Sequence, residues 1–181
     1  MASLSPNQKI DRILSLVQPK SVLDVGCGTG RTLLEMKRRG IAVIGVEASS
    51  AAIRASDCPD LIFRHDLRQP LDLNRRFDLV WCFEVAEHIH PNYVETFIAS
   101  LVRHSDTIAM SAAPPGQGGE GHFNEQPRSY WIAKLDTRGY RLHEGWTDEL
   151  RAVNEFYSHN MMVFTHPHPE CWELYCRIAK T

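Results

Sequence analysis

Residues 22–30 read VLDVGCGTG, an apolar run that leads directly into a glycine-rich turn. The apolar run predicts a buried strand over Ser21–Val25, and the residues that follow the turn predict a helix over Arg31–Arg39. Glycine has no Cβ, so the glycines of this turn let the backbone bend sharply and approach a ligand closely. The stretch therefore predicts a strand, a ligand-binding turn and a helix in direct succession.

An acidic residue, Glu47, stands at the end of the next apolar run, Ile41–Val46. In folds that bind nucleotides, an acid at this point accepts hydrogen bonds from the ribose hydroxyls. The dinucleotide fingerprint is G-x-G-x-x-G, whereas the glycines here are spaced G-x-G-x-G and Asp24 precedes the first by two residues. An anionic Asp24 suits a cationic amino or sulfonium group better than a diphosphate. We therefore expect a nucleoside-bearing cofactor, with an oxidoreductase or a non-catalytic nucleotide-binding relative as the alternative.

Four segments in order resemble the motifs of the class I S-adenosylmethionine-dependent methyltransferases: residues 23–30, Val46–Glu47, His65–Leu67 and Phe77–Cys82. The resemblance covers roughly residues 20–110 and is to the small-molecule type, with motifs like those of ubiquinone-type O-methyltransferases. It implies a Rossmann-like, doubly wound α/β fold. Such a fold has a mostly parallel, seven-stranded sheet, helices on both faces and an antiparallel last strand.

The alternation of apolar and amphipathic segments also predicts an α/β fold. Helices are expected over Pro6–Val17, Arg31–Arg39, Asn92–Arg103, Ser129–Arg138 and Glu149–Tyr157, with short ones from Ser49 or Ser50 and over Glu170–Ile178. Strands are expected over Ser21–Val25, Val43–Glu47, Leu61–His65, Phe77–Phe83, Thr107–Ser111, Tyr140–Trp146 and Met161–Thr165.

The resemblance also implies which residues hold the cofactor. Asp24 orients the turn or receives the cofactor's amino group through a water, and Glu47 binds the ribose. Asp66 accepts the adenine amino group beside the Leu67 amide, unless it is only a turn or N-cap acid. Phe83 packs on the ribose or adenine, unless it is a core aromatic. The whole predicted cofactor set is Asp24, Gly26, Cys27, Gly28, Gly30, Glu47, Asp66, Leu67 and Phe83.

A second group of ionisable side chains follows the fourth expected strand, where residues 84–88 read EVAEH. In a helix, Glu84, Glu87 and His88 would share one face, and His122 follows the fifth strand at the same sheet edge. Two carboxylates and two imidazoles can bind a divalent metal. The order is similar to the metal sites of small-RNA 3′-terminal 2′-O-methyltransferases and of ubiquinone-type O-methyltransferases, which lower the pKa of the acceptor hydroxyl. The alternatives are glutamates that cap the helix or line the pocket, and His88 or His122 as a general base without metal.

The size and composition of the chain limit the classes of protein to which it can belong. A chain of 181 residues predicts one domain, 1–181, in which residues 1–20 carry an N-terminal helix and 167–181 form a tail. Residues 112–128 hold a Gly/Pro-rich stretch that predicts a lid. A net charge of −2 disfavours nucleic acid and anionic membranes, and no apolar run approaches the ~20 residues of a membrane span. Five cysteines without a C-x-x-C pair indicate reduced thiols in the cytoplasm.

These patterns together predict methyl transfer from S-adenosylmethionine to an oxygen or nitrogen atom of a small-molecule acceptor. One alternative is metal-dependent 2′-O-methylation of an RNA 3′ end, which the net charge and the absence of an added RNA-binding domain disfavour. The other is a non-catalytic cofactor-binding module that supports a partner. Because the segment before Ser21 is short, we expect the lid, the second subunit of a homodimer or a large acceptor to cover the pocket.

Overall fold

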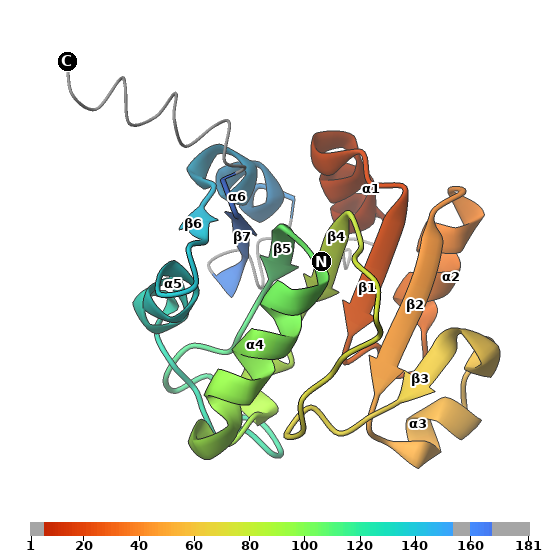
Figure 1. Cartoon of the computed structure of the whole chain (residues 1–181), viewed down its shortest axis with the longest axis horizontal. Coiled ribbons are helices and arrows are strands. Elements are labelled where there is room, and N and C mark those ends of the chain that lie inside the picture. The colour runs from red at the N-terminus through yellow and green to blue at the C-terminus, as the bar shows by residue number, and fades with distance from the viewer. Residues whose placement is uncertain (1–5, 154–159, 168–181) are drawn as a thin grey trace.

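The computed structural model describes residues 6–153 and 160–167. Within these ranges the strands form one seven-stranded sheet in the order β3-β2-β1-β4-β5-β7-β6 (Figure 1). Their bounds are β1 (Ser21–Val25), β2 (Ala42–Glu47), β3 (Ile62–Arg64), β4 (Leu79–Cys82), β5 (Thr107–Met110), β6 (Arg141–Leu142) and β7 (Met162–Thr165). Strands β1 to β5 pair in parallel, and β7 runs antiparallel to both β5 and β6. The predicted mostly parallel sheet with an antiparallel last strand is confirmed.

Helices and short 3₁₀ turns connect these strands. The helices are α1 (Pro6–Val17), α2 (Arg31–Arg38), α3 (Ser50–Arg54), α4 (Val94–His104), α5 (Arg128–Asp136) and α6 (Glu144–Arg151). The 3₁₀ turns are η1 (Pro59–Leu61), η2 (Ala86–His88) and η3 (Pro91–Tyr93). Two of these turns, η2 and η3, follow β4 directly and lead into α4, which brings polar residues to one end of the sheet.

Helices cover both faces of the sheet, as expected for parallel strands that are apolar on both sides. On one face α4 and α5 contribute Phe97 and Trp131 to a buried cluster. On the other, Ile13 of α1, Leu33 of α2 and Leu150 of α6 belong to a second cluster. Figure 1 shows α4 in front of the sheet and α2 behind it. The two clusters hold the strands rigidly, so the residues at the strand ends have fixed positions.

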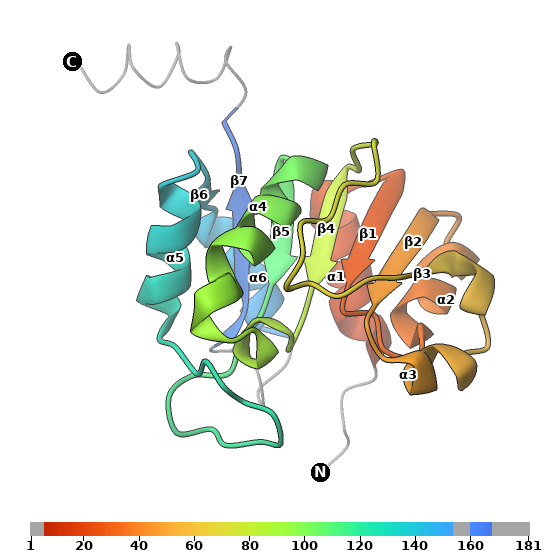
Figure 2. The ribbon, with the colours of Figure 1, turned by 60° about the horizontal axis from the view of Figure 1, so that its bottom comes forward.

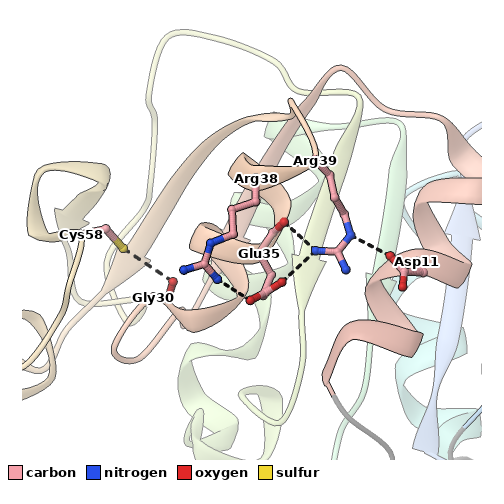
Figure 3. A network of polar contacts seen from close by, with 6 residues as sticks. All are labelled: Asp11, Gly30, Glu35, Arg38, Arg39 and Cys58. Carbon is pink, nitrogen blue, oxygen red and sulfur yellow. Dashed lines mark hydrogen bonds and ion pairs between the residues drawn. The ribbon is translucent and has the colours of Figure 1, made fainter.

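A polar network ties α2 to its neighbours at both of its ends (Figure 3). Arg39, which follows α2, binds Asp11 of α1 through Nε at 2.7 Å and Glu35 through Nη1 at 2.9 Å. At the other end the Cys58 thiol donates to the carbonyl oxygen of Gly30 at 3.6 Å. Exposed ion pairs of this kind each stabilise a fold only slightly. The Arg39–Asp11 pair joins the end of α2 to α1, whereas the Cys58 bond holds Gly30 at the start of α2, and with it the glycine turn that leads into the helix.

The order of the strands reverses at β1. This strand pairs with β2 on one side and with β4 on the other. In open α/β sheets, ligands bind outside the carboxyl ends of the strands at such a reversal. The turn after β1, the residues after β2 and the residues after β4 all lie at this edge, so the fold places the two predicted groups of site residues together.

The structure corrects the sequence prediction between β5 and β7. The sequence pattern predicts a strand over Tyr140–Trp146, but only Arg141–Leu142 is a strand, and α6 begins at Glu144. The cause is an N-cap that the alternating pattern does not reveal, because the ring Nδ1 of His143 accepts a hydrogen bond from the Trp146 amide at 3.1 Å. The helix expected over 149–157 therefore starts earlier, and residues 154–157 lie outside the described part.

The expectations about membrane spans, cysteines and the C-terminal tail can be compared with the structure only for the described residues. No helix in the described ranges is long and apolar enough to cross a membrane. The described cysteines, Cys27, Cys58 and Cys82, are free thiols. The tail, with its expected helix over 170–178, falls outside the described residues.

Candidate functional site

The turn after β1 brings the backbone close to its surroundings at two glycines. Gly26 has φ +77°, and a Cβ added there would lie 2.4 Å from Cγ2 of Val85, so a larger residue does not fit. Gly28 has φ +55°, and a Cβ added there would meet no atom within 4 Å. Both conformations are rare for residues with a side chain. The turn therefore packs tightly against the segment after β4 at Gly26 and leaves open space beside Gly28.

Glu47 is held at the end of β2 by two backbone amides. Its Oε2 accepts a hydrogen bond from the Gly28 amide at 2.9 Å, and its Oε1 accepts one from the Ser49 amide at 2.7 Å. A carboxylate has about four acceptor positions, so both oxygens retain capacity for further donors. The carboxylate is thus fixed beside the glycine turn and can still accept bonds from ribose hydroxyls.

Asp24 lies beneath the turn and is almost completely buried, with 3% of its surface exposed. Burial, with a smaller contribution from the negative charge of Glu47, raises the pKa of Asp24 to about 8. A buried carboxyl with such a pKa is mostly protonated at neutral pH. A cationic ligand nearby would stabilise its charged form, so this position suits a positively charged cofactor better than an anionic one.

One cavity of about 700 Å³ joins the two predicted groups of residues. From the predicted cofactor set, Gly26, Glu47, Asp66 and Leu67 line it. Glu84, Val85, His88, Tyr93 and Phe123 are among the other residues that line it. Figure 2 shows the connection from β5 to α5 (residues 111–127, here the β5–α5 loop) extending beyond the carboxyl edge of the sheet. The predicted lid, residues 112–128, therefore lies beside the cavity, and its mobility stays a prediction.

Asp66 lines the cavity and also closes a turn. Its Oδ1 accepts a hydrogen bond from the Arg68 amide at 3.0 Å, and its Oδ2 pairs with Nη2 of the same arginine at 2.6 Å. Hydrogen bonding from the Arg68 side chain lowers the pKa of Asp66. The turn role that we considered as the alternative is thus present, while adenine binding by Asp66 stays a prediction.

Five residues of the predicted cofactor set are not among those that line the cavity: Asp24, Cys27, Gly28, Gly30 and Phe83. The ring of Phe83 stacks on Trp81 with 4.0 Å between centroids, and it packs against the cluster that contains α1, α2 and α6. This arrangement is that of a core aromatic, the alternative we considered. The Cys27 thiol packs against Gly45, where an added Cβ would lie 2.6 Å from its sulfur, and burial raises the pKa of Cys27. The side chain of Cys27 thus points into the protein, and only its backbone forms part of the turn.

The second group of ionisable residues is a cluster of Glu87, His88 and His122. Each offers one ligand atom, and these atoms lie within 4.8 Å of one another. The two imidazole rings meet edge to face with 4.9 Å between centroids. Two neutral imidazoles and a carboxylate are ligand types that divalent transition metals prefer. The structure thus brings together three of the four residues predicted for metal binding.

Glu87 is the least satisfied residue of this cluster. It is fully buried, and neither carboxylate oxygen has a hydrogen-bond partner among the described residues. Burial is the main cause that raises the pKa of Glu87 to about 7. The amides of Glu87 itself and Ala113 lie near enough to oppose this rise, but neither makes a well-formed bond to the carboxylate. Buried polar atoms are nearly always paired, so these oxygens indicate an absent partner.

Glu84 does not join the cluster, which corrects our sequence prediction. Its backbone is left-handed, with φ +55°, a conformation that costs a residue with a side chain roughly 1–2 kcal/mol. Ser111 holds it there, because the Ser111 hydroxyl accepts from the Glu84 amide at 3.0 Å and donates to Glu84 Oε1 at 2.7 Å. The chain then forms the 3₁₀ turn η2 instead of a helix. The predicted helical face of Glu84, Glu87 and His88 is wrong, and metal binding itself stays a prediction.

Sequence reasoning missed Glu125, Tyr93 and Phe123 as site residues. Glu125 bonds His122 from three residues further along the chain, and this H-x-x-E spacing was the available signal. Tyr93 and Phe123 line the cavity although they are 38% and 66% exposed. Large exposed aromatics beside a cavity are a feature of binding surfaces, but no periodicity in the sequence distinguishes them.

Comparison with known proteins identifies the family. Residues 3–107 match the model of a methyltransferase domain, a range that includes β1 to β4, the glycine turn and Glu87. The chain therefore belongs to the class I S-adenosylmethionine-dependent methyltransferases. This confirms the family that the four sequence motifs indicate.

The chain is also similar to curated proteins and solved structures. A ubiquinone biosynthesis O-methyltransferase of Nitrosomonas europaea is 29% identical over 133 residues, 68% of this chain and 52% of that protein. The corresponding protein of Dechloromonas aromatica is 31% identical over 139 residues, 70% of this chain and 53% of its own. The chain thus spans about half the length of the curated relatives it matches.

Solved structures resemble this one in fold. The methyltransferase domain of bacterial CtHen1-C has a TM-score of 0.65 at 20% identity and covers 88% of this chain and 95% of its own. The S-adenosylmethionine-bound amino pentose methyltransferase CalS10 of Micromonospora echinaspora has a TM-score of 0.68 at 16% identity, with 88% and 90% covered. At these identities the likeness establishes the Rossmann-like methyltransferase fold.

Proposed function

We propose that this chain transfers the methyl group of S-adenosylmethionine to an oxygen or nitrogen atom of a small molecule. The observation that carries the proposal is a cavity of about 700 Å³ that is lined by Gly26 of the glycine turn, by Glu47 and by His88. Methyl transfer needs the two reactants aligned in one site, with a base near the acceptor. This cavity has the size and the residues for both.

The residues of the turn fit the cofactor. Open space beside Gly28 accommodates a ligand in contact with the backbone, and the fixed Glu47 carboxylate suits a ribose. The buried Asp24 carboxyl suits the cationic end of the molecule. S-adenosylmethionine, when bound, supplies a methyl group already activated on a sulfonium. The remaining task of the protein is therefore to orient the acceptor, exclude water and remove a proton.

Two histidines are candidates to remove that proton: His88 lines the cavity, and the ring of His122 lies next to it with 4.9 Å between centroids. The Nδ1 atom of His88 lies 3.0 Å from the carbonyl oxygen of Gly121, and Nδ1 of His122 lies 2.9 Å from Oε1 of Glu125. Because both partners can only accept, each Nδ1 carries a hydrogen, and in the neutral ring Nε2 is then the nitrogen with the free electron pair. An imidazole held in this tautomer can accept the proton of a hydroxyl or amine. The exposed rings of Tyr93 and Phe123 are placed to contact the acceptor.

A divalent metal at Glu87, His88 and His122 is a second component of the proposal. The buried, unpaired oxygens of Glu87 favour it, because an ion beside them would satisfy a carboxylate that otherwise destabilises the fold. When bound, the ion supplies Lewis-acid activation of an acceptor oxygen. The proposed metal ligands are then Glu87, His88 and His122. Glu84 is not one of them, because its carboxylate accepts a hydrogen bond from Ser111.

The experiment that tests the function uses methyl-labelled S-adenosylmethionine and two acceptor pools from cells, one of small molecules and one of total RNA. We expect label in the small-molecule pool and none in RNA. Label only in RNA would support 2′-O-methylation of an RNA end instead. Cofactor binding without transfer to either pool would support a non-catalytic module. A parallel reaction with chelator and with added Mg²⁺, Mn²⁺ or Zn²⁺ tests the metal.

A further inference from the structure

The Glu125 carboxylate accepts hydrogen bonds from three other residues of the β5–α5 loop. Its Oε1 accepts hydrogen bonds from the Gly118 amide at 2.7 Å and from Nδ1 of His122 at 2.9 Å. Its Oε2 accepts one from the Gly116 amide at 2.8 Å. The Glu125 and His122 side chains are only 18% and 12% exposed. A single carboxylate thus binds the β5–α5 loop at two points and an imidazole of the site at a third.

We propose that Glu125 is a positioning residue that fixes the ring of His122 and the β5–α5 loop in one arrangement. This inference rests on the proposed function, because it assigns Glu125 a role at that site. A carboxylate that accepts from Nδ1 selects the tautomer in which Nε2 is free, and it also fixes the rotation of the ring. Neither Glu125 nor His122 is among the residues that line the cavity, whereas His88 is. Glu125 therefore acts through His122, whose ring meets that of His88 edge to face with 4.9 Å between centroids.

The loop completes the arrangement through other contacts. The carbonyl oxygen of Gly121 accepts from Nδ1 of His88 at 3.0 Å. The carbonyl oxygen of Glu87 accepts from the amides of Phe123 and Asn124, both at 3.0 Å. The loop therefore holds both imidazoles by their Nδ1 atoms and is joined to η2 by backbone bonds. Release of Glu125 would loosen the loop and His122 together, because the same side chain holds both.

Two substitutions of Glu125 separate its contacts. In Glu125→Gln, an amide oxygen placed at the Oε1 position keeps Gly118 and His122 but turns an NH₂ group toward the Gly116 amide. In Glu125→Ala all three bonds are lost. The matched control is Glu95→Gln, since Glu95 also accepts from two side chains, Lys134 and Arg138, at a surface that does not line the cavity.

The first readout is the tautomer of His122 in the protein without cofactor, from long-range ¹H–¹⁵N spectra of the imidazole nitrogens, assigned with His122→Gln. We expect the Nδ1–H tautomer in the wild type and in Glu95→Gln, a partial loss of it in Glu125→Gln, and a shift toward Nε2–H in Glu125→Ala. The second readout is methyl transfer into the small-molecule pool. It should fall about 10- to 100-fold in Glu125→Ala, with unchanged affinity for S-adenosylhomocysteine.

The outcomes distinguish this inference from the proposed function. If the His122 spectrum of Glu125→Ala equals that of the wild type, Glu125 does not position the ring and the inference is wrong. If the tautomer shifts as expected but the wild type transfers no methyl group to any acceptor, the positioning role holds and the proposed function fails. Equal losses in Glu125→Ala and Glu95→Gln would also contradict the inference, because they would indicate general destabilisation.

Discussion

The amide of Gly28 donates a 2.9 Å hydrogen bond to Oε2 of Glu47, which joins the turn after β1 to the end of β2. The bond fixes the carboxylate beside the turn, and a Cβ on Gly28 would meet no atom within 4 Å, so space beside the turn stays open. Because Ser49 holds the other oxygen, the carboxylate has one fixed position before any ligand arrives. A preorganised acceptor of this kind reduces the entropy that binding must otherwise overcome.

Replacement of Glu47 should therefore weaken cofactor binding. In Glu47→Gln the charge is lost, and one of the two amides faces an NH₂ group. We expect the Kd for S-adenosylhomocysteine to rise about 10- to 100-fold, as for the loss of hydrogen bonds to a charged group. Isothermal titration calorimetry measures it, with Glu149→Gln as a control at an exposed ion pair. Unchanged affinity in Glu47→Gln would show that the carboxylate does not hold the ribose.

The raised pKa of Asp24, about 8, predicts a dependence of stability on pH. Between about pH 4 and pH 8 the folded protein keeps the proton on Asp24, whereas the unfolded chain has released it. The stability that this proton provides is complete below about pH 4 and is lost as the pH rises to about 8. The free energy of unfolding should fall by up to about 1.4 kcal/mol per pH unit from this group.

Denaturation of the wild type and of Asp24→Asn at pH 5, 6, 7 and 8 measures this slope. The difference in unfolding free energy between the two proteins should change steadily in favour of Asp24→Asn as the pH rises. A constant difference across that range would mean that Asp24 is ionised in the folded protein throughout.

Glu87 and Glu84 give opposite predictions for metal binding. Glu87→Gln removes the charge of a buried, unpaired carboxylate, so the variant should lose Zn²⁺ or Co²⁺ binding without loss of folding stability. Glu84→Gln should keep the metal, because Glu84 contacts Ser111 and lies outside the cluster. Calorimetric titration with each ion, together with melting curves, tests both variants. Equal loss of metal in the two would restore Glu84 as a ligand.

A methyl group at Gly119 should disturb His122. A Cβ there would lie 2.5 Å from Nε2 of the ring, so Gly119→Ala must displace an imidazole that Glu125 holds. We expect methyl transfer to fall at least about tenfold while cofactor affinity is unchanged. Gly118→Ala is the control, since its Cβ would meet nothing within 4 Å and only its φ of +71° is strained. A larger loss in Gly118→Ala than in Gly119→Ala would indicate that loop strain, not the ring, matters.

The first half of the fold could be predicted from sequence because its signals are local. The apolar run before Gly26 and the acid at Glu47 both stand within a single βαβ unit, where strand, turn and helix follow one another. The segment from Tyr140 to Trp146 was mispredicted because it alternates like a strand. Its helix depends on the ring of His143 accepting from Trp146, and a histidine is an uncommon N-cap.

The geometry of the ionisable residues that follow β4 and β5 could not be predicted from the sequence, because it depends on contacts between distant parts of the chain. The left-handed backbone of Glu84 is stabilised by Ser111, which β5 brings beside the end of β4. The orientation of His122 depends on Glu125 and the loop glycines, whose bonds form only when the loop folds back. Residue types and spacing predicted that Glu87, His88 and His122 would meet, but not which partners would fix them.

The proposed function requires that one cavity aligns the cofactor with an acceptor and its base, and His88 lines that cavity. The most direct measurement is a reaction of methyl-labelled S-adenosylmethionine with the small-molecule pool, catalysed by the wild type and by His88→Ala at equal cofactor saturation. We expect labelled small molecules with the wild type, at least about a hundredfold less with His88→Ala, and equal cofactor affinity. Label that stays on the cofactor with the wild type, or transfers equally well with His88→Ala, would contradict the proposed function.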